Sequence, residues 1–501
     1  MKTRQLILGG AIMMSMAMAM VGCHGNGRDA SEVKKGNAAI GVSVHDPAIV
    51  KDDGKYYIFG SHMAAAESTN LADWTIFAEG VNGGNKLFDN LFDDDMKAFD
   101  YVGRFTDGKY AVWAPDVIYN EAMGKWVMYF CTSHDYMTSN LCMATADDVK
   151  GPYSYQKTLL YSGFVGATAE KTNFYEIMGD DANIRDYMAS GKYNNLSYPN
   201  CIDPAIFTDK DGNMHLVYGS WSGGIWMLDV DPQTGGLIHP EADADAHIDK
   251  YFGRYLIGGL HNSCEGPYIF YNEDTGYYYL TVSYGELTRE GGYQIRVFRS
   301  KDVYGPYVDA KGETLGLAHD HSEFGVKLIG NYSLPSLKTA YMAPGHNSVL
   351  IDDDGRMYVV YHQRFDSGTE FHEPRVHELI MTESGWPAAM PFNVTLEKEG
   401  TQSAYSEKDI EGKWYFLNHG TDISADIHSA AEAKIKSGRI SGEAMNGSIA
   451  VSAGTHYVTI TVGDVVYNGV IADMSDEVGN PVRCITAVGN NNETIWGVMY
   501  L

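Results

Sequence analysis

The stretch that decides the fold begins with His45-Asp46-Pro47-Ala48-Ile49-Val50, crosses Asp53-Gly54 and continues with Tyr56-Tyr57-Ile58-Phe59. An Asp-Gly pair between two apolar runs is a strong signal of a β-hairpin. The unit returns four more times, always as an acidic or amide residue near a proline, an apolar run, a turn and a second run, usually rich in tyrosine. The leading residues of the five copies are Asp46, Asp116, Asp203, Glu265 and Asn347.

Each copy is long enough for four short strands with their loops, which is the size of one propeller blade. No long amphipathic helix interrupts the copies. A ring of blades leaves only short, protected sheet edges, so repetition favours a propeller over a sandwich. We therefore predict an all-β protein with a five-bladed β-propeller over residues 42–395.

The repeat ends near Pro391. The following stretch is rich in Glu, Lys, Ser and Gly and predicts a linker over residues 396–408. Beyond it, apolar runs such as Trp414-Tyr415-Phe416 are typical of strands. We predict a small C-terminal β domain over residues 409–501, either a barrel or a sandwich.

The N-terminus is typical of an export signal. Lys2 and Arg4 precede an apolar run that closes with Met20-Val21-Gly22-Cys23, which is similar to a bacterial lipoprotein signal. This interpretation makes residues 1–22 the signal peptide, Cys23 the lipidated residue and 23–41 a tether; the alternative is an ordinary signal peptide with an incidental cysteine. We expect a cell-envelope lipoprotein in the outer membrane of a Gram-negative bacterium, in contact with the membrane only through the lipid.

The charge balance limits the partners. Lys and Arg number 37 against 65 Asp and Glu, a net charge of −28. Such a field repels phosphate backbones, so we expect no nucleic-acid partner and a neutral or cationic ligand. We also expect the protein to be a monomer. The cysteines beyond Cys23 form no C-x-x-C pair, so zinc is not expected.

The five leading residues are candidates for chemistry because the innermost strands of a propeller converge on its axis. Converging carboxylates push one another's pKa values apart, which leaves one ionised and another protonated. Acid/base hydrolysis needs this division. The alternative is that Asp-Pro merely begins strands, since proline cannot donate to a ladder.

The motifs His45-Asp46-Pro47, Ile202-Asp203-Pro204 and Glu265-Gly266-Pro267, with Trp113-Ala114-Pro115-Asp116 and Ala343-Pro344-Gly345-His346-Asn347, resemble glycoside hydrolase family 43. Within that family the chain is most similar to endo-α-1,5-L-arabinanases with an extra C-terminal β domain. The resemblance implies that Asp46 is the general base, Glu265 the general acid and Asp203 the residue that tunes and orients Glu265. Family members invert the anomeric centre, which implies carboxylates about 6.5 to 9.5 Å apart.

The resemblance further implies that His346 helps to hold a Ca²⁺ ion on the propeller axis. An ordinary hydrogen-bonded histidine is the alternative, because Ca²⁺ prefers oxygen ligands. Aromatic side chains stack on sugars and large polar groups bond their hydroxyls. The candidates for substrate binding are Trp113, Asp116, Asn200, Trp221, Asn347 and Arg364, each with packing or a salt bridge as its alternative.

The predicted function is that of an inverting hydrolase that cuts internal α-1,5-L-arabinofuranosidic bonds of arabinan. An exo-acting α-L-arabinofuranosidase or β-xylosidase of the same fold is an alternative function. The insertion loops determine whether the substrate binds in an open groove or in a closed pocket, and the spacing of the motifs does not show which. A non-catalytic, lipid-anchored glycan-binding protein also remains open. The C-terminal domain is expected to bind polysaccharide, to brace the propeller or to complete the groove wall.

Overall fold

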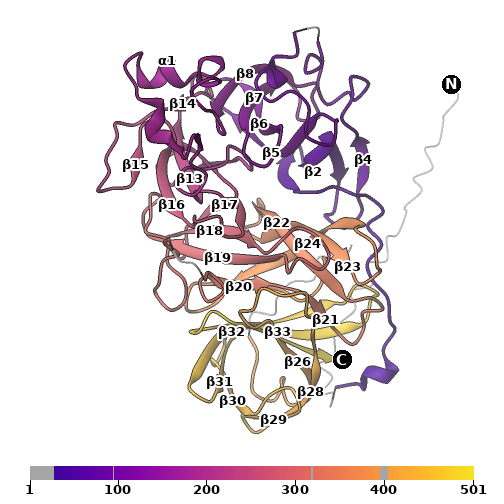
Figure 1. Cartoon of the computed structure of the whole chain (residues 1–501). Helices are drawn as coiled ribbons and strands as arrows, with labels where there is room; N and C mark the ends of the chain where they lie inside the picture. Colours follow the sequence, from indigo (N-terminus) through magenta and orange to yellow (C-terminus); the bar gives the residue numbers. More distant parts are fainter. Residues whose placement is uncertain (1–26, 94, 318–319, 395–403) are drawn as a thin grey trace, which may run out of the picture.

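The computed structural model describes residues 27–93, 95–317, 320–394 and 404–501, and it consists almost entirely of antiparallel sheets (Figure 1). The predicted signal peptide and Cys23 lie outside the described residues. The first hairpin shows why the strands form where they do. Asp53 and Gly54 both have positive φ, 43° and 73°, as a tight two-residue hairpin turn requires. The strands on either side pair from Asp52 with Lys55 to Ala48 with Phe59.

Five sheets follow one another along the chain, each made of consecutive strands. Blade one contains β1 (Ala48–Asp52), β2 (Lys55–Gly60), β3 (Ala64–Ser68) and β4 (Thr75–Ala78). Blade two contains β5 (Ala111–Asn120), β6 (Lys125–Ser133), β7 (Ser139–Ala146) and β8 (Ser154–Tyr161). Blade three contains β11 (Ala205–Thr208), β12 (Met214–Tyr218), β13 (Ile225–Val230), β14 (Leu237–Ile238), β15 (Ile248–Asp249) and β16 (Gly253–Ile257).

Blade four contains β17 (Cys264–Asn272), β18 (Tyr277–Tyr284), β19 (Gln294–Ser300) and β20 (Val326–Ile329). Blade five contains β21 (Tyr332–Ser333), β22 (Tyr341–Ile351), β23 (Met357–Phe365), β24 (His372–Met381) and β25 (Pro387–Ala389). Helical turns are confined to η1 (Ala30–Glu32), η2 (Ser61–Met63), η3 (Lys97–Phe99), η4 (Ala169–Lys171), α1 (Phe174–Met178) and η5 (Ile184–Tyr187) among the described residues. The insertion between blades two and three holds α1 and the short pair β9 (Met188–Ala189) and β10 (Lys192–Tyr193).

The innermost strands close a ring. β1 lies against β5, β5 against β11, β11 against β17, β17 against β22, and β22 against β1. The Ser348 hydroxyl ties the last blade to the first, because it accepts from the Ile49 N–H at 3.1 Å and donates to the Pro47 carbonyl at 2.7 Å. The predicted five-bladed propeller is confirmed.

Three of the five innermost strands, β5, β17 and β22, carry a β-bulge where they enter the ring. In blade four, Glu265 and Tyr268 lie opposite Ser283 and Thr281, so one extra residue is inserted. The first bulge residue of each has positive φ, namely Ala114 (42°), Gly266 (56°) and His346 (48°). Asp46 (54°) and Asp203 (56°), two residues before β1 and β11, have positive φ as well. Blade five carries a second bulge at Ala343. The equivalent axial positions are therefore 46, 114, 203, 266 and 346, and three of the five leading residues that the sequence suggested, Asp116, Glu265 and Asn347, are out of register.

The C-terminal domain is a closed barrel, the first of the two predicted forms. Its strands are β26 (Gly412–Asn418), β28 (Ala431–Lys436), β29 (Arg439–Gly442), β30 (Gly447–Val451), β31 (Tyr457–Val462), β32 (Val465–Ser475), β33 (Pro481–Gly489) and β34 (Thr494–Tyr500). Pairing of β26 with β34 closes it. Tyr405, inside the expected linker, packs into the barrel core.

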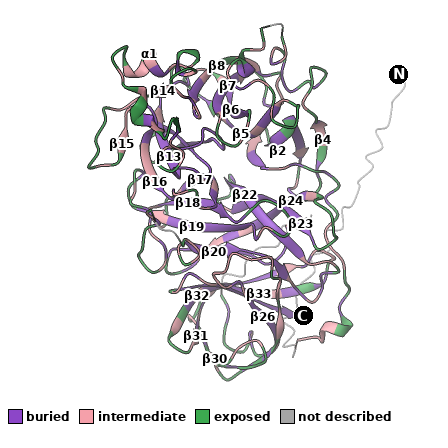
Figure 2. Ribbon diagram, viewed as in Figure 1, coloured by how far each residue is buried: buried purple, intermediate pink, exposed green. Residues whose placement is uncertain are grey.

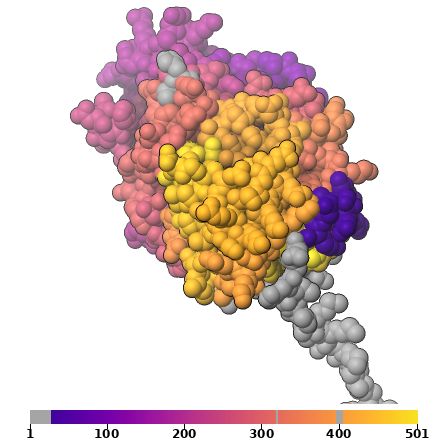
Figure 3. Space-filling model, turned by 90° about the horizontal axis from the view of Figure 1, so that it is seen from below, coloured from indigo at the N-terminus to yellow at the C-terminus, as the bar shows by residue number. Residues whose placement is uncertain are grey.

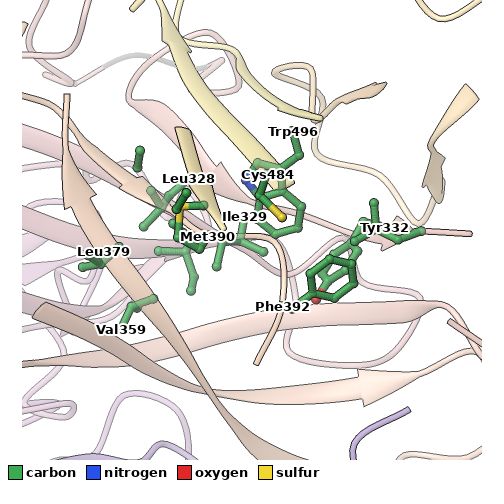
Figure 4. Close-up of a cluster of buried hydrophobic side chains, with 14 of the residues drawn as sticks. Leu328, Ile329, Tyr332, Val359, Leu379, Met390, Phe392, Cys484 and Trp496 are labelled. Atoms are coloured by element: carbon green, nitrogen blue, oxygen red, sulfur yellow. The ribbon is translucent and has the colours of Figure 1, made fainter. Parts of the chain in front are cut away.

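The barrel and the propeller share one core. Leu328 and Ile329 of blade four and Tyr332 of blade five pack with Cys484 and Trp496 of the barrel (Figure 4). The strand β27 (His428–Ser429), which follows β26 in the chain, pairs in parallel with β21 and so extends the sheet of blade five. Buried residues lie on both sides of the boundary, in β20 and in β33 (Figure 2). The contacts fit the bracing role among the three possibilities for this domain.

The described part of the expected tether, residues 27–41, lies along the barrel and blade five. The Arg28 N–H donates to the Tyr500 carbonyl at 2.8 Å, and Asn37 exchanges two hydrogen bonds with Thr339. Seen from below, this segment is the indigo patch beside the yellow barrel (Figure 3). Among the described residues, no helix is long and apolar enough to cross a membrane.

Candidate active site

Three of the four acids that lead copies of the repeat, Asp46, Asp203 and Glu265, come together at the axis. Asp46 and Asp203 have positive φ two residues before β1 and β11, and Glu265 precedes the bulge glycine of blade four. The N–H of Gly266 donates to Asp203 Oδ2 at 3.2 Å, so the strand of Glu265 is joined to the segment that carries Asp203. A side chain on Gly266 would lie 3.0 Å from the His346 ring, so that ring packs directly against this backbone.

Asp46 is 8% exposed and lies among three histidines. Its Oδ2 is 2.7 Å from His45 Nδ1 and accepts from the Ser61 hydroxyl at 2.5 Å. Its Oδ1 is 3.2 Å from His346 Nδ1 and 3.6 Å from His362 Nδ1. Burial by itself raises the pKa of Asp46, but the charge of His346 and the hydrogen bond from His45 outweigh it and hold that pKa well below its usual range.

Glu265 has a different environment. Oε1 accepts from the Tyr293 hydroxyl at 2.7 Å, and Oε2 accepts from Ser220 Oγ at 3.0 Å and Trp221 Nε1 at 2.9 Å. Burial raises the pKa of Glu265 although these donors oppose the rise. Burial likewise raises the pKa of Asp203 to about 7.

His346 faces all these acids. Burial lowers its pKa, but the charges of Asp46, Asp203 and Glu265 raise it more, so the net shift of the His346 pKa is upward. The arrangement therefore contains one carboxyl group whose pKa is lowered and two whose pKa values are raised. Acids whose pKa values are shifted in opposite directions can donate a proton on one side of a bond and accept one on the other.

Two of the expected sugar-binding residues are half-buried aromatics. The Trp113 ring is part of a group with Phe105, at 5.0 Å, and Tyr136, at 6.1 Å. Tyr136 is 67% exposed, so this group presents an apolar face to solvent. Trp221 directs its indole N–H to Glu265, which combines an aromatic surface with a hydrogen bond to the candidate acid.

The polar candidates are buried and mostly occupied. Asn200 donates to the Tyr136 carbonyl at 2.8 Å and accepts from Ser162, so it supports the loop that carries Tyr136. Arg364 donates to Glu370 at 3.0 Å and lies 3.2 Å from His45 Nε2. Asn347 donates to Thr281, while its Oδ1 is buried with no partner among the described residues.

Asp116 has a structural role. Its Oδ1 accepts from the Val117 N–H at 2.9 Å, and its Oδ2 accepts from the Ile206 N–H of the next blade at 2.8 Å. It is 4% exposed and lies two residues past the bulge position Ala114. The carboxylate therefore joins blade two to blade three, and its binding of a sugar stays a prediction.

Several residues of the site escaped the sequence analysis. His45 stood inside a quoted motif without a role, and Ser61, Tyr293 and His362 stood in none. The Asp46–His45 contact could have been suspected from their adjacency, but Tyr293 lies in a loop that carries no recognisable signal. His45, Asp46 and His362 also have potential ligand atoms within 4.8 Å of one another, a possible metal-binding group that excludes the predicted ligand His346.

A propeller whose axis holds one ionised and two protonatable carboxyl groups beside half-buried aromatics has the apparatus of a glycoside hydrolase. The family model of glycosyl hydrolases family 43 matches residues 36–172 and 159–387, and that of a C-terminal lipocalin-like domain matches residues 392–497. The chain belongs to glycoside hydrolase family 43.

Relatives match along nearly the whole chain. An extracellular endo-α-(1→5)-L-arabinanase of Bacillus subtilis is 37% identical, over 91% of this chain and 92% of its own. One from Thermotoga petrophila is 34% identical, over 91% and 93%. A family 43 protein of Bacillus licheniformis superposes with a TM-score of 0.79 at 34% identity, covering 93% of this chain and 99% of its own. The endo-1,5-α-L-arabinanase of Thermotoga petrophila in complex with TRIS gives 0.78 at 33%, covering 92% and 98%.

Proposed function

We propose that the protein hydrolyses internal α-1,5-L-arabinofuranosidic bonds of arabinan with inversion at the anomeric carbon. The observation that carries the proposal is that Asp46 and Glu265 lie at one axis with their pKa values shifted in opposite directions, Asp46 among imidazoles and Glu265 among neutral donors. The relatives that are more than 30% identical over nine-tenths of the chain are endo-arabinanases by name, and this supports the internal bond as the target. An exo-acting relative is only 24% identical.

Each acid has one role in this reaction. Asp46, held ionised by its histidines, accepts a proton from water as the water oxygen attacks the anomeric carbon. Glu265, whose pKa is raised by burial, gives its proton to the glycosidic oxygen that leaves. Asp203 bonds the backbone of Gly266 and so orients Glu265. Hydrolysis consumes one water, and the two protons balance.

The aromatic group of Trp113, Phe105 and Tyr136 suits the apolar faces of furanose rings. Trp221 extends such a surface to the candidate acid. Arg364 Nη1 is buried without a partner among the described residues, which leaves it a donor for a sugar hydroxyl.

The test of this function uses linear arabinan and xylan and follows product sizes with time. Mixed oligomers that appear early from arabinan alone support the proposal, whereas monomer alone indicates exo action. Glu265→Gln should lose turnover and keep binding. If neither polymer is cut and Glu265→Gln binds arabinan as the wild type does, the protein is a binding module.

A calcium ion at His346 is part of the proposal. The excess of carboxyl groups around one imidazole and the unpartnered oxygen of Asn347 fit a hydrated divalent cation. When bound, the ion would supply positive charge that favours ionised Asp46. Metal analysis and thermal melting before and after mild chelation test it: we expect loss of calcium to lower the melting temperature and added Ca²⁺ to restore it. A chelated protein with an unchanged melting temperature and full activity would exclude the ion.

We also retain the lipid anchor at Cys23 as a proposal. The segment from Arg28 onward is fixed to the barrel, so an anchor a few residues earlier would hold the enzyme to the outer membrane on the barrel side. Metabolic labelling with a fatty-acid analogue tests this, with Cys23→Ala as the control. Label that persists in Cys23→Ala would exclude this site of lipidation.

A further inference from the structure

Three aromatic rings lie face to face between the candidate acid and the candidate base. The Tyr293 ring stacks on His362 with centroids 5.6 Å apart and an interplanar angle of 16°. His362 in turn stacks on His45 at 3.9 Å and 20°. The outer rings end on the two acids, because Tyr293 donates to Glu265 and His45 Nδ1 lies 2.7 Å from Asp46.

The polarity of the His45 end is determined by Arg364. A guanidinium only donates, so the 3.2 Å contact between Arg364 Nη2 and His45 Nε2 makes that nitrogen an acceptor. The proton of neutral His45 is then on Nδ1, where it is donated to Asp46. Both outer rings therefore hold a carboxyl oxygen through a directed hydrogen bond.

The middle ring is rigidly held and does not reach solvent. His362 is completely buried, and its Nδ1 accepts from the Asp46 N–H at 3.3 Å. Its Nε2 then carries the hydrogen and has no partner among the described residues. A buried donor without a partner destabilises the fold, so the ring is retained at a cost. His362 is thus a spacer that forms no hydrogen bond with the carboxylate side chain of Asp46 or Glu265.

A glycine makes room for the stack. Gly345 pairs with His362 across the sheet, and a Cβ at Gly345 would lie 2.1 Å from Tyr293 Cε1. Its φ is not positive, so the requirement is space and not backbone conformation. Any side chain there would push the Tyr293 ring from its place.

We propose that the stack of Tyr293, His362 and His45 sets the distance between acid and base, with His362 as a positioning residue. The inference rests on the proposed roles of Asp46 and Glu265. Inversion needs a distance between the carboxyl groups of Asp46 and Glu265 that admits one water molecule. If that distance varies, turnover falls although every reacting group is still present. Misplacement by about 1 Å can cost a hundredfold in rate.

Two substitutions at His362 separate its ring from its hydrogen bond. His362→Asn places an acceptor near Nδ1 but removes the ring, whereas His362→Phe keeps the ring and removes the acceptor. On linear arabinan we expect kcat of His362→Asn to fall at least about tenfold with little change in KM, and kcat of His362→Phe to stay within about fivefold of wild type. Equal losses in the two variants, or a larger loss in His362→Phe, would overturn the inference.

Gly345→Ala tests the other end and does not depend on the folding of the His362 variants. It should lower kcat about tenfold on arabinan, and much less on an aryl arabinoside, whose phenolate leaves without a proton from Glu265. In a Tyr293→Phe background, Gly345→Ala should lower kcat little further, because the hydroxyl group that positions Glu265 is already absent. Equal loss on both substrates, or losses that simply multiply, would contradict the inference.

The wild type separates the two proposals. A wild type that cuts no arabinan defeats the proposed function. An active wild type whose Gly345→Ala and His362→Asn variants have unchanged kcat defeats only the spacing inference.

Discussion

Three buried acids divide their protons unevenly at the axis because their neighbours differ. Three imidazoles surround Asp46, while three neutral donors surround Glu265. A neutral hydrogen-bond donor stabilises an ionised carboxylate less than a nearby positive charge does. Burial therefore determines the direction of the pKa shift at Glu265 but not at Asp46. The pH dependence of the enzyme is therefore set by side chains that do not themselves react.

Tyr293→Phe tests this at one atom. The Tyr293 hydroxyl lowers the pKa of Glu265 by bonding its ionised form, so its removal raises that pKa further. The acid must be protonated to act, and a higher pKa extends the protonated state to higher pH. We expect the basic limb of the kcat/KM profile on arabinan to move to higher pH, with a lower maximum because Glu265 is held less firmly. An unmoved limb, or one moved to lower pH, would contradict this expectation.

The sequence predicted that three acids of the site lie close together. It did not predict the neighbouring residues that shift the pKa values of these acids. Adjacency in sequence brought His45 to Asp46, whereas Tyr293 and His362 reach the site only through the stacking of two blades. Asp116, which leads the second copy of the repeat, was predicted as a substrate-binding residue. Its carboxylate spans two blades, which no pattern within one blade can show.

The bulge that β5, β17 and β22 share is the element that aims side chains at the axis in three blades. The alternating pattern of a strand predicts which residues are buried, and the fivefold repetition of a leading residue, a turn and two apolar runs was enough to recognise five blades. A bulge adds one residue and shifts the alternation, so the leading residues of the repeat were displaced by one or two positions in three blades. Positive φ at the axial positions cannot be read from Asp, Ala or His, which rarely adopt it.

Gly266→Ala tests the bulge. Gly266 has φ 56°, and an added Cβ would meet the His346 ring at 3.0 Å. Left-handed backbone costs about 1 to 2 kcal/mol for alanine, and displacement of His346 removes a positive charge from Asp46. We expect lower stability in urea and a lower kcat on arabinan. The matched control is Ala114→Gly at the equivalent bulge of blade two, which relieves strain and should lower neither quantity; a Gly266→Ala variant that behaves like this control would refute the argument.

At the scale of the whole molecule, the two predicted domains are less separate than the sequence indicated. The sequence showed where the repeat stops, and a change of composition marked a linker. It could not show that β27 returns to blade five or that residues 27–41 lie along the barrel, because both depend on contacts between segments far apart in the chain. Closure of the barrel, which excluded a sandwich, depends on the pairing of its first and last strands.

Because one core crosses the boundary, the propeller and the barrel should unfold together. Trp496 of the barrel is fully buried, and its ring lies 4.9 Å from that of Tyr332 in blade five. Trp496→Ala should therefore cost about 3 to 5 kcal/mol while the unfolding transition remains single. Calorimetry detects unfolding of the barrel, and the loss of arabinan hydrolysis on heating detects unfolding of the propeller. We expect the midpoints of the two transitions to coincide in the wild type and in the variant. A barrel transition that precedes the loss of activity would show that the propeller does not depend on the brace.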